Sequence, residues 1–178
     1  MASTKRESVS FSLRSGSENE RRIRFRVIET AWRAAYKHIY YTNEIDGVFD
    51  GRLPSYGDWV ERRKASRGHI VAESDGKMVG VASLALLRSG EGEVTALYVL
   101  PDYQGYGIGQ ALWNASCERL REMDCPAVWV WTLARAAATR FYERQGCVRA
   151  DSGSYTVGPH VETAVGFRLE LDAGQTGK

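Results

Sequence analysis

Residues 93–110, EVTALYVLPDYQGYGIGQ, hold the pattern on which the fold assignment depends. The first part is rich in Val, Thr, Leu and Tyr, and Pro101 closes it; because proline cannot donate to a sheet ladder, this part predicts a strand that ends just before it. Glycine then stands at every second position over residues 105–109. Apolar residues recur at helical spacing afterwards, which predicts a helix over residues 107–123.

The glycine-rich turn between this strand and this helix predicts an anion site. The first N–H groups of a helix have no partners within it, the helix dipole is positive at that end, and glycine lets ligand oxygens come close. A Walker loop would need Lys-Ser or Lys-Thr where Gln110 and Ala111 stand, and a dinucleotide fingerprint would need its third glycine one residue after Gly109. Both common nucleotide loops are therefore disfavoured, and a turn that only joins strand to helix is the structural alternative.

A second pattern lies downstream. Residues 127–133, AVWVWTL, follow Pro126 and predict a strand. Residues 134–145 predict a short helix that is stopped by Gly146, since glycine is the usual residue just past a helix end. The end of this helix reads FYERQG.

These two patterns resemble the GNAT superfamily of N-acetyltransferases. QGYGIG resembles the Q/R-x-x-G-x-G/A loop of the family, and FYERQGC resembles its F-Y-x-x-x-G-F signature at the expected distance, with Cys147 in place of the usual aromatic or aliphatic residue. The resemblance covers residues 93–147 well and the rest only through the order of its elements. It implies an α/β fold in the order βααβββαβαββ, with a mixed, mostly antiparallel twisted sheet of about seven strands flanked by helices on both faces.

The same resemblance implies acetyl-CoA as the acyl donor, with its pyrophosphate at the glycine turn and its pantetheine arm between the two strands described above, and it implies no metal. Arg135 stands where the family often has an asparagine that contacts the pantetheine amides; because arginine only donates, that contact is either lost or turned into donation. The residues expected at the donor are Leu97, Tyr98, Val99, Gln104, Gly105, Tyr106, Gly107, Ile108, Gly109, Gln110, Arg135, Ala138 and Tyr142.

Direct attack of an amine on a thioester needs two proton transfers. Tyr142 matches the tyrosine that lies beside the CoA sulfur in many relatives, so it is expected to be the general acid, with a purely packed tyrosine as the alternative. Glu93 is the candidate base, directly or through water, although it also fits a strand-pairing carboxylate, and His160 is a further candidate base. A sheet-edge N–H in residues 97–99 is expected to stabilise the oxyanion.

The first third of the chain predicts a strand, a helix and a loop. Residues 9–13 alternate apolar and polar and predict the first strand. Ser17 and Glu20 fit a capping box at the start of a long amphipathic helix that reaches about residue 40. Residues 41–56 lose this periodicity and predict a loop that can hold a helical turn.

The remaining segments predict one more helix and two hairpins. Residues 54–67 predict a helix, and residues 69–73 and 78–87, joined by Ser-Asp-Gly, predict a hairpin that leads into the first strand discussed. The strand that follows the glycine turn and its helix is expected to lie parallel to its predecessor, because the crossover is long. Residues 147–157 and 161–171 predict a final hairpin.

Three residues are candidate contacts of the acceptor. The resemblance places the first long helix beside the acceptor, which makes Trp32 and Tyr36 candidates, although their helical spacing equally fits core residues. Glu44 lies in a stretch where acidic residues are interleaved with aromatic ones and could attract a cationic amine; a solvated surface loop is the alternative.

Composition limits the other possibilities. The 178 residues fit one domain, expected over 8–171 between tails at 1–7 and 172–178, and a net charge of +2 gives no electrostatic case for nucleic acid or an anionic membrane. No apolar run approaches the roughly 18 residues that span a bilayer, and the first 19 residues lack the apolar middle of a signal peptide, so a cytoplasmic location is expected. The three cysteines lack zinc-site spacing and are expected to be buried or half-buried thiols.

The sequence thus predicts an N-acetyltransferase that acetylates a primary amine, of a small molecule or of a peptide, and family habit implies a homodimer. The alternative from another class is a catalytically silent module that binds acetyl-CoA or CoA and regulates a partner. A nicotinamide oxidoreductase is disfavoured, because its glycine loop would follow the first strand instead of lying in mid-chain.

Overall fold

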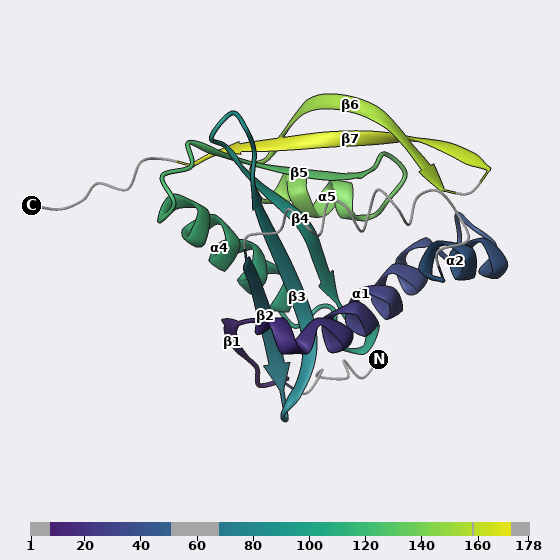
Figure 1. The fold of residues 1–178 in the computed structure, drawn as a ribbon, viewed down its shortest axis with the longest axis horizontal. Coiled ribbons are helices and arrows are strands. Elements are labelled where there is room, and N and C mark those ends of the chain that lie inside the picture. The colour runs from purple at the N-terminus through teal and green to yellow at the C-terminus, as the bar shows by residue number, and fades with distance from the viewer. Residues whose placement is uncertain (1–7, 51–67, 158, 172–178) are drawn as a thin grey trace, which may run out of the picture.

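A single seven-stranded sheet runs through the computed structural model, which describes residues 8–50, 68–157 and 159–171 (Figure 1). The strand order is β1-β2-β3-β4-β5-β7-β6, and only the β4–β5 pair is parallel. The strands are β1 (Ser12–Ser15), β2 (Gly68–Ser74), β3 (Lys77–Leu86), β4 (Gly92–Val99), β5 (Ala127–Leu133), β6 (Val148–Val157) and β7 (His160–Glu170). The expected mixed, mostly antiparallel sheet is confirmed.

Four helices are described around this sheet, together with two single 3₁₀ turns, and the predicted order βααβββαβαββ is confirmed. The helices are α1 (Arg21–Tyr36), α2 (Thr42–Phe49), α4 (Ile108–Arg121) and α5 (Ala138–Arg144). The turns are Glu18–Glu20 before α1 and Pro101–Tyr103 after β4.

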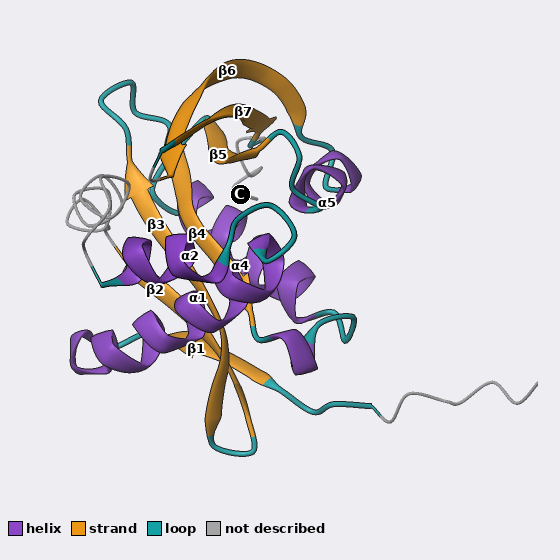
Figure 2. Ribbon diagram, turned by 90° about the vertical axis from the view of Figure 1, so that its right-hand side faces the viewer, coloured by secondary structure: helices purple, strands orange, loops and turns teal. Residues whose placement is uncertain are grey.

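Helices α1 and α4 cover opposite faces of β2, β3 and β4. Successive side chains of a strand point to opposite faces, and the buried residues of these strands divide accordingly. Those packed with α1 include Val71, Val81 and Ala96, and those packed with α4 include Ala72, Ala82 and Val99. Figure 2 shows α1 crossing in front of these strands.

A bulge in β4 opens the sheet next to β5. The register between β3 and β4 shifts after Ser83, so that Thr95 has no partner opposite; its hydroxyl donates to the Ser83 carbonyl at 3.3 Å. A bulged strand bends and twists away from its neighbour. Accordingly β4 pairs with β5 only over residues 92–94, opposite residues 128–130, and the two strands separate beyond that point.

Beyond this gap, β5, β7 and β6 form a second arm of the sheet. Its inner face packs Val128, Val130 and Phe167 against α4 and α5. Its other face carries Trp129 and Trp131, which are half-buried. Among the described helices, α1 and α2 reach this second face only at its far end, where their last aromatic and aliphatic residues cluster with residues of β5 and β6.

The structure corrects the start of the chain. The capping box is present, since Glu20 accepts the Ser17 N–H at 2.7 Å. The first strand spans Ser12–Ser15 instead of starting at residue 9, because its pairing with β2 begins at Ser12 opposite Glu73. Helix α1 ends at Tyr36, four residues early, and the chain then continues in turns.

Two further corrections concern helices. The loop predicted from residue 41 is wrong up to residue 49, where α2 forms because Ile45, Val48 and Phe49 share one buried side and Glu44 accepts the Tyr41 N–H at 2.8 Å. The helix predicted from residue 134 begins only at Ala138, because the Ala134 N–H is bonded to the Thr163 carbonyl of β7 at 2.8 Å. The helix predicted over 54–67 lies outside the described residues.

Candidate active site

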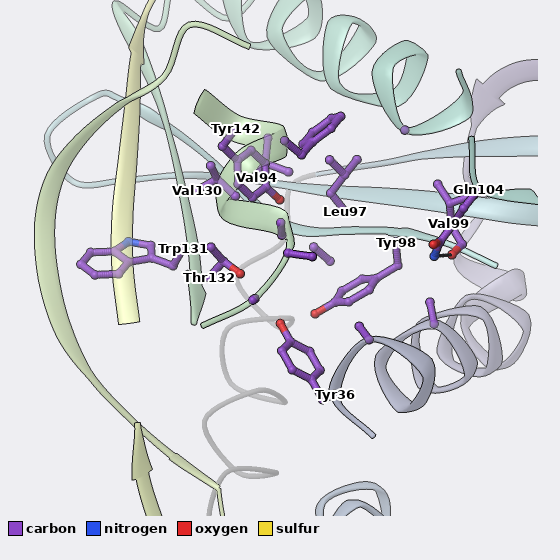
Figure 3. Close-up of a pocket in the computed structure, with 18 of the residues that line it drawn as sticks. Tyr36, Val94, Leu97, Tyr98, Val99, Gln104, Val130, Trp131, Thr132 and Tyr142 are labelled. Atoms are coloured by element: carbon purple, nitrogen blue, oxygen red, sulfur yellow. Dashed lines mark hydrogen bonds between the residues drawn. The ribbon is translucent and has the colours of Figure 1, made fainter. Parts of the chain in front are cut away.

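A cavity of about 390 Å³ occupies the gap between β4 and β5 (Figure 3). Its walls come from α1, β4, β5, the start of α4, and α5 with the turn before it. On the α4 side it is lined by Leu97, Val99, Gln104, Gly109, Ala138 and Tyr142, and on the α1 side by Tyr36, Tyr98 and Trp131. The cavity therefore passes through the sheet from one face to the other.

The glycine turn gives α4 an uncapped start beside this cavity. Gly105 and Gly107 both have φ of +84°, a left-handed conformation that favours glycine. Gly107 is the N-cap, no side chain caps the helix, and the first turn holds no acidic residue. The first hydrogen bond within the helix runs from the Ala111 N–H to the Gly107 carbonyl at 2.9 Å. The amides of residues 108–110 thus point out of the helix start, as an anion site requires.

The two glutamines of the motif have different places. Gln104 donates to the Val99 carbonyl at 2.9 Å and so fixes the turn to the end of β4. The Gln110 side chain donates to Asn114 at 2.9 Å and to Gln145 at 2.5 Å, which ties α4 to the end of α5. Only the backbone N–H of Gln110 is therefore directed toward a ligand at the helix start. Tyr106, between the glycines, is half-buried.

Beyond the bulge, β4 directs amides into the gap. The Leu100 N–H bonds to the Val79 carbonyl of β3 at 2.8 Å. Backbone groups of successive strand residues point to alternate sides, so those of Tyr98 also face β3, whereas those of Leu97 and Val99 face the gap. Gln104 occupies the Val99 carbonyl. The N–H groups of Leu97 and Val99 are the strand-edge donors at the cavity.

Tyr142 of α5 lines the cavity and is deeply buried. It is 5% exposed, and its ring packs against Trp113 and Phe167 with centroids 5.5 and 5.8 Å away. Burial raises the pKa of Tyr142 above the ordinary value for tyrosine, so the phenol stays protonated at neutral pH. Burial likewise raises the pKa of Tyr36, whose hydroxyl is hydrogen-bonded to Thr132.

Glu93 is not among the described residues that line the cavity. It lies in β4 in register with Ala85 of β3 and Trp129 of β5, within the segment where β4 and β5 still pair. Its neighbour Val94 packs on the α4 side, so the Glu93 side chain is on the α1 side of the sheet. Any reaction at the cavity would have to reach this carboxylate through water.

Beside the cavity, Arg135 forms an ion pair, and Glu44 and His160 are hydrogen-bonded to each other. The Nε of Arg135 donates to Glu162 of β7 at 3.1 Å, so this arginine is directed to a carboxylate instead of into the gap. His160 Nε2 lies 2.6 Å from Glu44 Oε1, which joins the start of β7 to the start of α2. Trp32 is a core residue, 5% exposed and stacked on Tyr40 at 5.9 Å.

Sequence reasoning missed part of the wall. Three alanines of α1 and two residues of β5 line the cavity without having been expected there: Ala31, Ala34, Ala35, Trp131 and Thr132. The alanines carry a signal, because their i, i+3, i+4 spacing places small side chains on one side of a helix. Trp131 carries none, because its contact with the cavity depends on the separation of β4 from β5.

The described residues offer neither a reactive thiol, nor a cluster of metal ligands, nor a membrane-spanning helix. Cys117, Cys125 and Cys147 are free and buried, and burial raises the pKa of Cys117 to about 11 and that of Cys147 to about 12. Such thiols are poor nucleophiles at neutral pH. The described part of the chain brings no three metal-ligating side chains together. None of its helices has the length and apolar character to cross a bilayer.

Comparison with known proteins places this geometry in context. Residues 28–147 match the family model of the acetyltransferase (GNAT) family. An uncharacterized N-acetyltransferase of Archaeoglobus fulgidus is 32% identical over 108 residues, which are 57% of this chain and 73% of that protein. A mycothiol acetyltransferase of Saccharopolyspora erythraea is 31% identical over 105 residues, which are 58% of this chain but only 33% of that protein.

A solved structure shares the fold. The crystal structure of PaiA N-acetyltransferase from Thermoplasma acidophilum, in complex with coenzyme A, superposes with a TM-score of 0.71 at 16% identity. The match covers 90% of this chain and 99% of that one. The overall fold is therefore shared with a protein of very different sequence.

Proposed function

This chain belongs to the acetyltransferase (GNAT) family, and on that premise we propose that it transfers the acetyl group of acetyl-CoA to a primary amine of a small molecule within one ternary complex. The observation that carries the proposal is the cavity through the sheet, with the uncapped start of α4 at one mouth and Tyr142 in its wall. Binding both reactants in one passage turns their reaction into an effectively unimolecular step.

The start of α4 is proposed to hold the diphosphate of acetyl-CoA. The amides at residues 105–110 supply donors at the positive end of a 14-residue helix, and the glycines leave room for oxygens to approach. From there the gap between β4 and β5 leads past Val99 and Leu97 to Tyr142. Ala138 borders the same passage, and its small side chain leaves width for a pantetheine arm.

The strand-edge amides and Tyr142 are proposed to stabilise the transition state. As the amine nitrogen bonds to the acetyl carbon, the carbonyl oxygen gains negative charge, which the N–H groups of Leu97 and Val99 can stabilise; such donors contribute roughly 3 kcal/mol each. The carbon–sulfur bond then breaks, and the Tyr142 phenol gives its proton to the departing sulfur. Because burial raises its pKa, Tyr142 is protonated when that step occurs.

Glu93 is proposed to accept the proton that the amine loses, through water, since it lies on the α1 side of the sheet beyond the cavity wall. His160 is less suited to this role, because it is paired with Glu44. Arg135, paired with Glu162, is proposed to contribute nothing to the pantetheine contact, and Trp32 is proposed to support Tyr36 from the core.

A Tyr142→Phe variant tests the catalytic assignment. It removes the proton donor and keeps the packing against Trp113, so turnover should fall by about 10²-fold, the lower range for a general acid, while acetyl-CoA affinity stays nearly intact. Released CoA would be measured with a thiol reagent over a library of amines, and affinity by calorimetry. Tyr40→Phe, which removes the hydroxyl of a buried tyrosine that does not line the cavity, is the matched control.

Unchanged turnover in Tyr142→Phe across pH would remove the assigned role of this residue. Binding of acetyl-CoA without release on any amine would favour the alternative of a regulatory module. Absence of binding would overturn the proposal as a whole. The single acetyltransferase domain over 8–171, the cytoplasmic location and the homodimer stay predictions, which limited proteolysis, fractionation and sedimentation would test.

A further inference from the structure

We propose that Trp131 is a platform on which a planar aromatic ring of the acceptor stacks, so that the amine acetylated by this protein carries an aromatic ring. The inference rests on the proposed function, because it names the acceptor of that reaction. It starts from the position of Trp131, which lines the cavity on the α1 side and points from β5 over β7, away from Tyr142 (Figure 3).

Two glycines seat the indole of Trp131 on the second arm of the sheet. Trp131 is in register with Gly166 of β7, and a Cβ at Gly166 would come within 2.9 Å of the indole carbon Cζ2. Gly153 of β6, the next strand, lies with its would-be Cβ 3.7 Å from Cζ3. The ring therefore lies over Gly166, in a place that a side chain there would enter, and its edge reaches Gly153.

A second tryptophan braces this platform. The rings of Trp129 and Trp131 stack with centroids 6.3 Å apart and planes 13° from parallel. Trp129 is itself fixed, since its Nε1 donates to Glu91 at 3.0 Å and Arg168 donates to the same carboxylate at 2.9 Å. A ring held in this way loses little freedom when a ligand stacks on it, which favours binding.

The acceptor has to approach from the side of Trp131. The amides at the start of α4 lie on the opposite face of the sheet, and the proposed donor fills the passage from there. The mouth on the α1 side is the one left for the amine. The residues that line it include three alanines of α1, the hydroxyl-bearing rings of Tyr36 and Tyr98, and Trp131.

The chemistry of this mouth favours a ring over a cation. Aromatic pairs stack favourably beyond the area they bury, and cations also bind indole faces when carboxylates assist. Three carboxylates in the described part of this face are already engaged: Glu91 with Arg168, Glu162 with Arg135, and Asp151 with the Ser152 N–H at 2.8 Å. Glu93, on the same side, is proposed to serve the amine nitrogen itself. A neutral planar group therefore fits the platform better than a second ammonium.

Two amines of equal carbon count test the platform. 2-Phenylethylamine and 2-cyclohexylethylamine carry the same aminoethyl group, but only the first has a planar ring. The wild-type protein should prefer the aromatic amine in kcat/KM by about 2- to 10-fold, the range expected for one stacking contact. Trp131→Leu should bring this ratio close to one, through KM of the aromatic amine.

A second platform variant and a control variant accompany Trp131→Leu. Gly166→Ala should also lower the ratio, because its methyl group displaces the indole without removing it. Tyr41→Leu is the control, since Tyr41 is an exposed aromatic residue that does not line the cavity, and the ratio should stay above one. Calorimetry with acetyl-CoA shows that each variant is folded.

The outcomes separate the platform from the proposed function. Equal kcat/KM for the two amines in wild type, or a preference that Trp131→Leu leaves unchanged, overturns the platform while acetyl transfer stands. A larger preference for 1,5-diaminopentane that Trp131→Leu abolishes overturns the aromatic assignment in favour of a cation. If no amine is acetylated, binding of both amines in the presence of CoA is measured by the quenching of tryptophan fluorescence. Tighter binding of 2-phenylethylamine that is lost in Trp131→Leu supports the platform, although the proposed function has failed. Equal binding of the two amines overturns the platform.

Discussion

The two arms of the sheet are stabilised by different means. In the arm of β2, β3 and β4, helices cover both faces, and residues such as Leu112 and Ile28 are fully buried. In the arm of β5, β7 and β6, described helices cover one face, and the other face is held by half-buried tryptophans and by ion pairs such as Glu91–Arg168. The first arm is thus a scaffold for the glycine turn, and the second arm has a face that the described helices cover only at its far end.

The largest expected effect compares the two arms directly. Leu112→Ala in the first arm should destabilise the protein by about 2–5 kcal/mol, because a fully buried leucine leaves a cavity against β3. Trp129→Ala in the second arm should cost about 1 kcal/mol, mainly for the lost hydrogen bond to Glu91. Urea unfolding with unchanged m-values would measure both. Equal losses would show that the second arm is as tightly packed as the first.

A smaller loss of stability is expected from substitutions in the glycine turn at the start of α4. Gly107→Ala should destabilise the protein by about 1–2 kcal/mol, because a residue other than glycine is strained at a φ of +84°. Gly109→Ala is the matched variant: it lies within α4, and its new methyl group would meet Phe141 and Val99 at an ordinary 3.9 Å. Both should weaken acetyl-CoA binding in calorimetry, but only Gly107→Ala should lower the unfolding midpoint.

The smallest effect concerns the exposed edge of the first arm. Hydrogen bonds from Arg14, and then from the Ser17 N–H, lower the pKa of Glu20 to about 2. A lowered pKa in the folded state gives stability that is present above the unfolded value of about 4.3 and is lost as the pH falls through about 2. The loss should be small, because exposed ion pairs contribute little. Glu20→Gln should flatten this part of the curve of unfolding free energy against pH; an unchanged slope would contradict the assignment.

Local pattern was sufficient for the elements that face the donor. The strand, the glycine turn and α4 each carry their own signal, namely β-branched residues closed by Pro101, glycines at positive φ, and an apolar helical period. The sheet of about seven strands was implied by the family resemblance that these elements carry. The placement of Tyr142 at the cavity agrees with the expectation from the F-Y signature, but its catalytic role stays a prediction.

Features that depend on contacts between distant segments were not predictable in the same way. Helix α2 is fixed by packing against the ends of α1 and β5, which outweighs the glycine within it. The late start of α5 follows from the bond between Ala134 and Thr163, residues far apart in the sequence. Arg135 turns to Glu162 because β7 lies beside β5, and Trp131 reaches the cavity because β4 and β5 separate.

The unpaired residue Thr95 has a consequence for the access of the two substrates. The bulge at Thr95 adjoins the point where β4 and β5 separate, so residues from both faces of the sheet line one cavity. Under the proposed function, the coenzyme and the amine can therefore reach the cavity from opposite faces of the sheet. One inserted amino acid in a strand thereby provides separate routes for two substrates that have to meet at a single carbon atom.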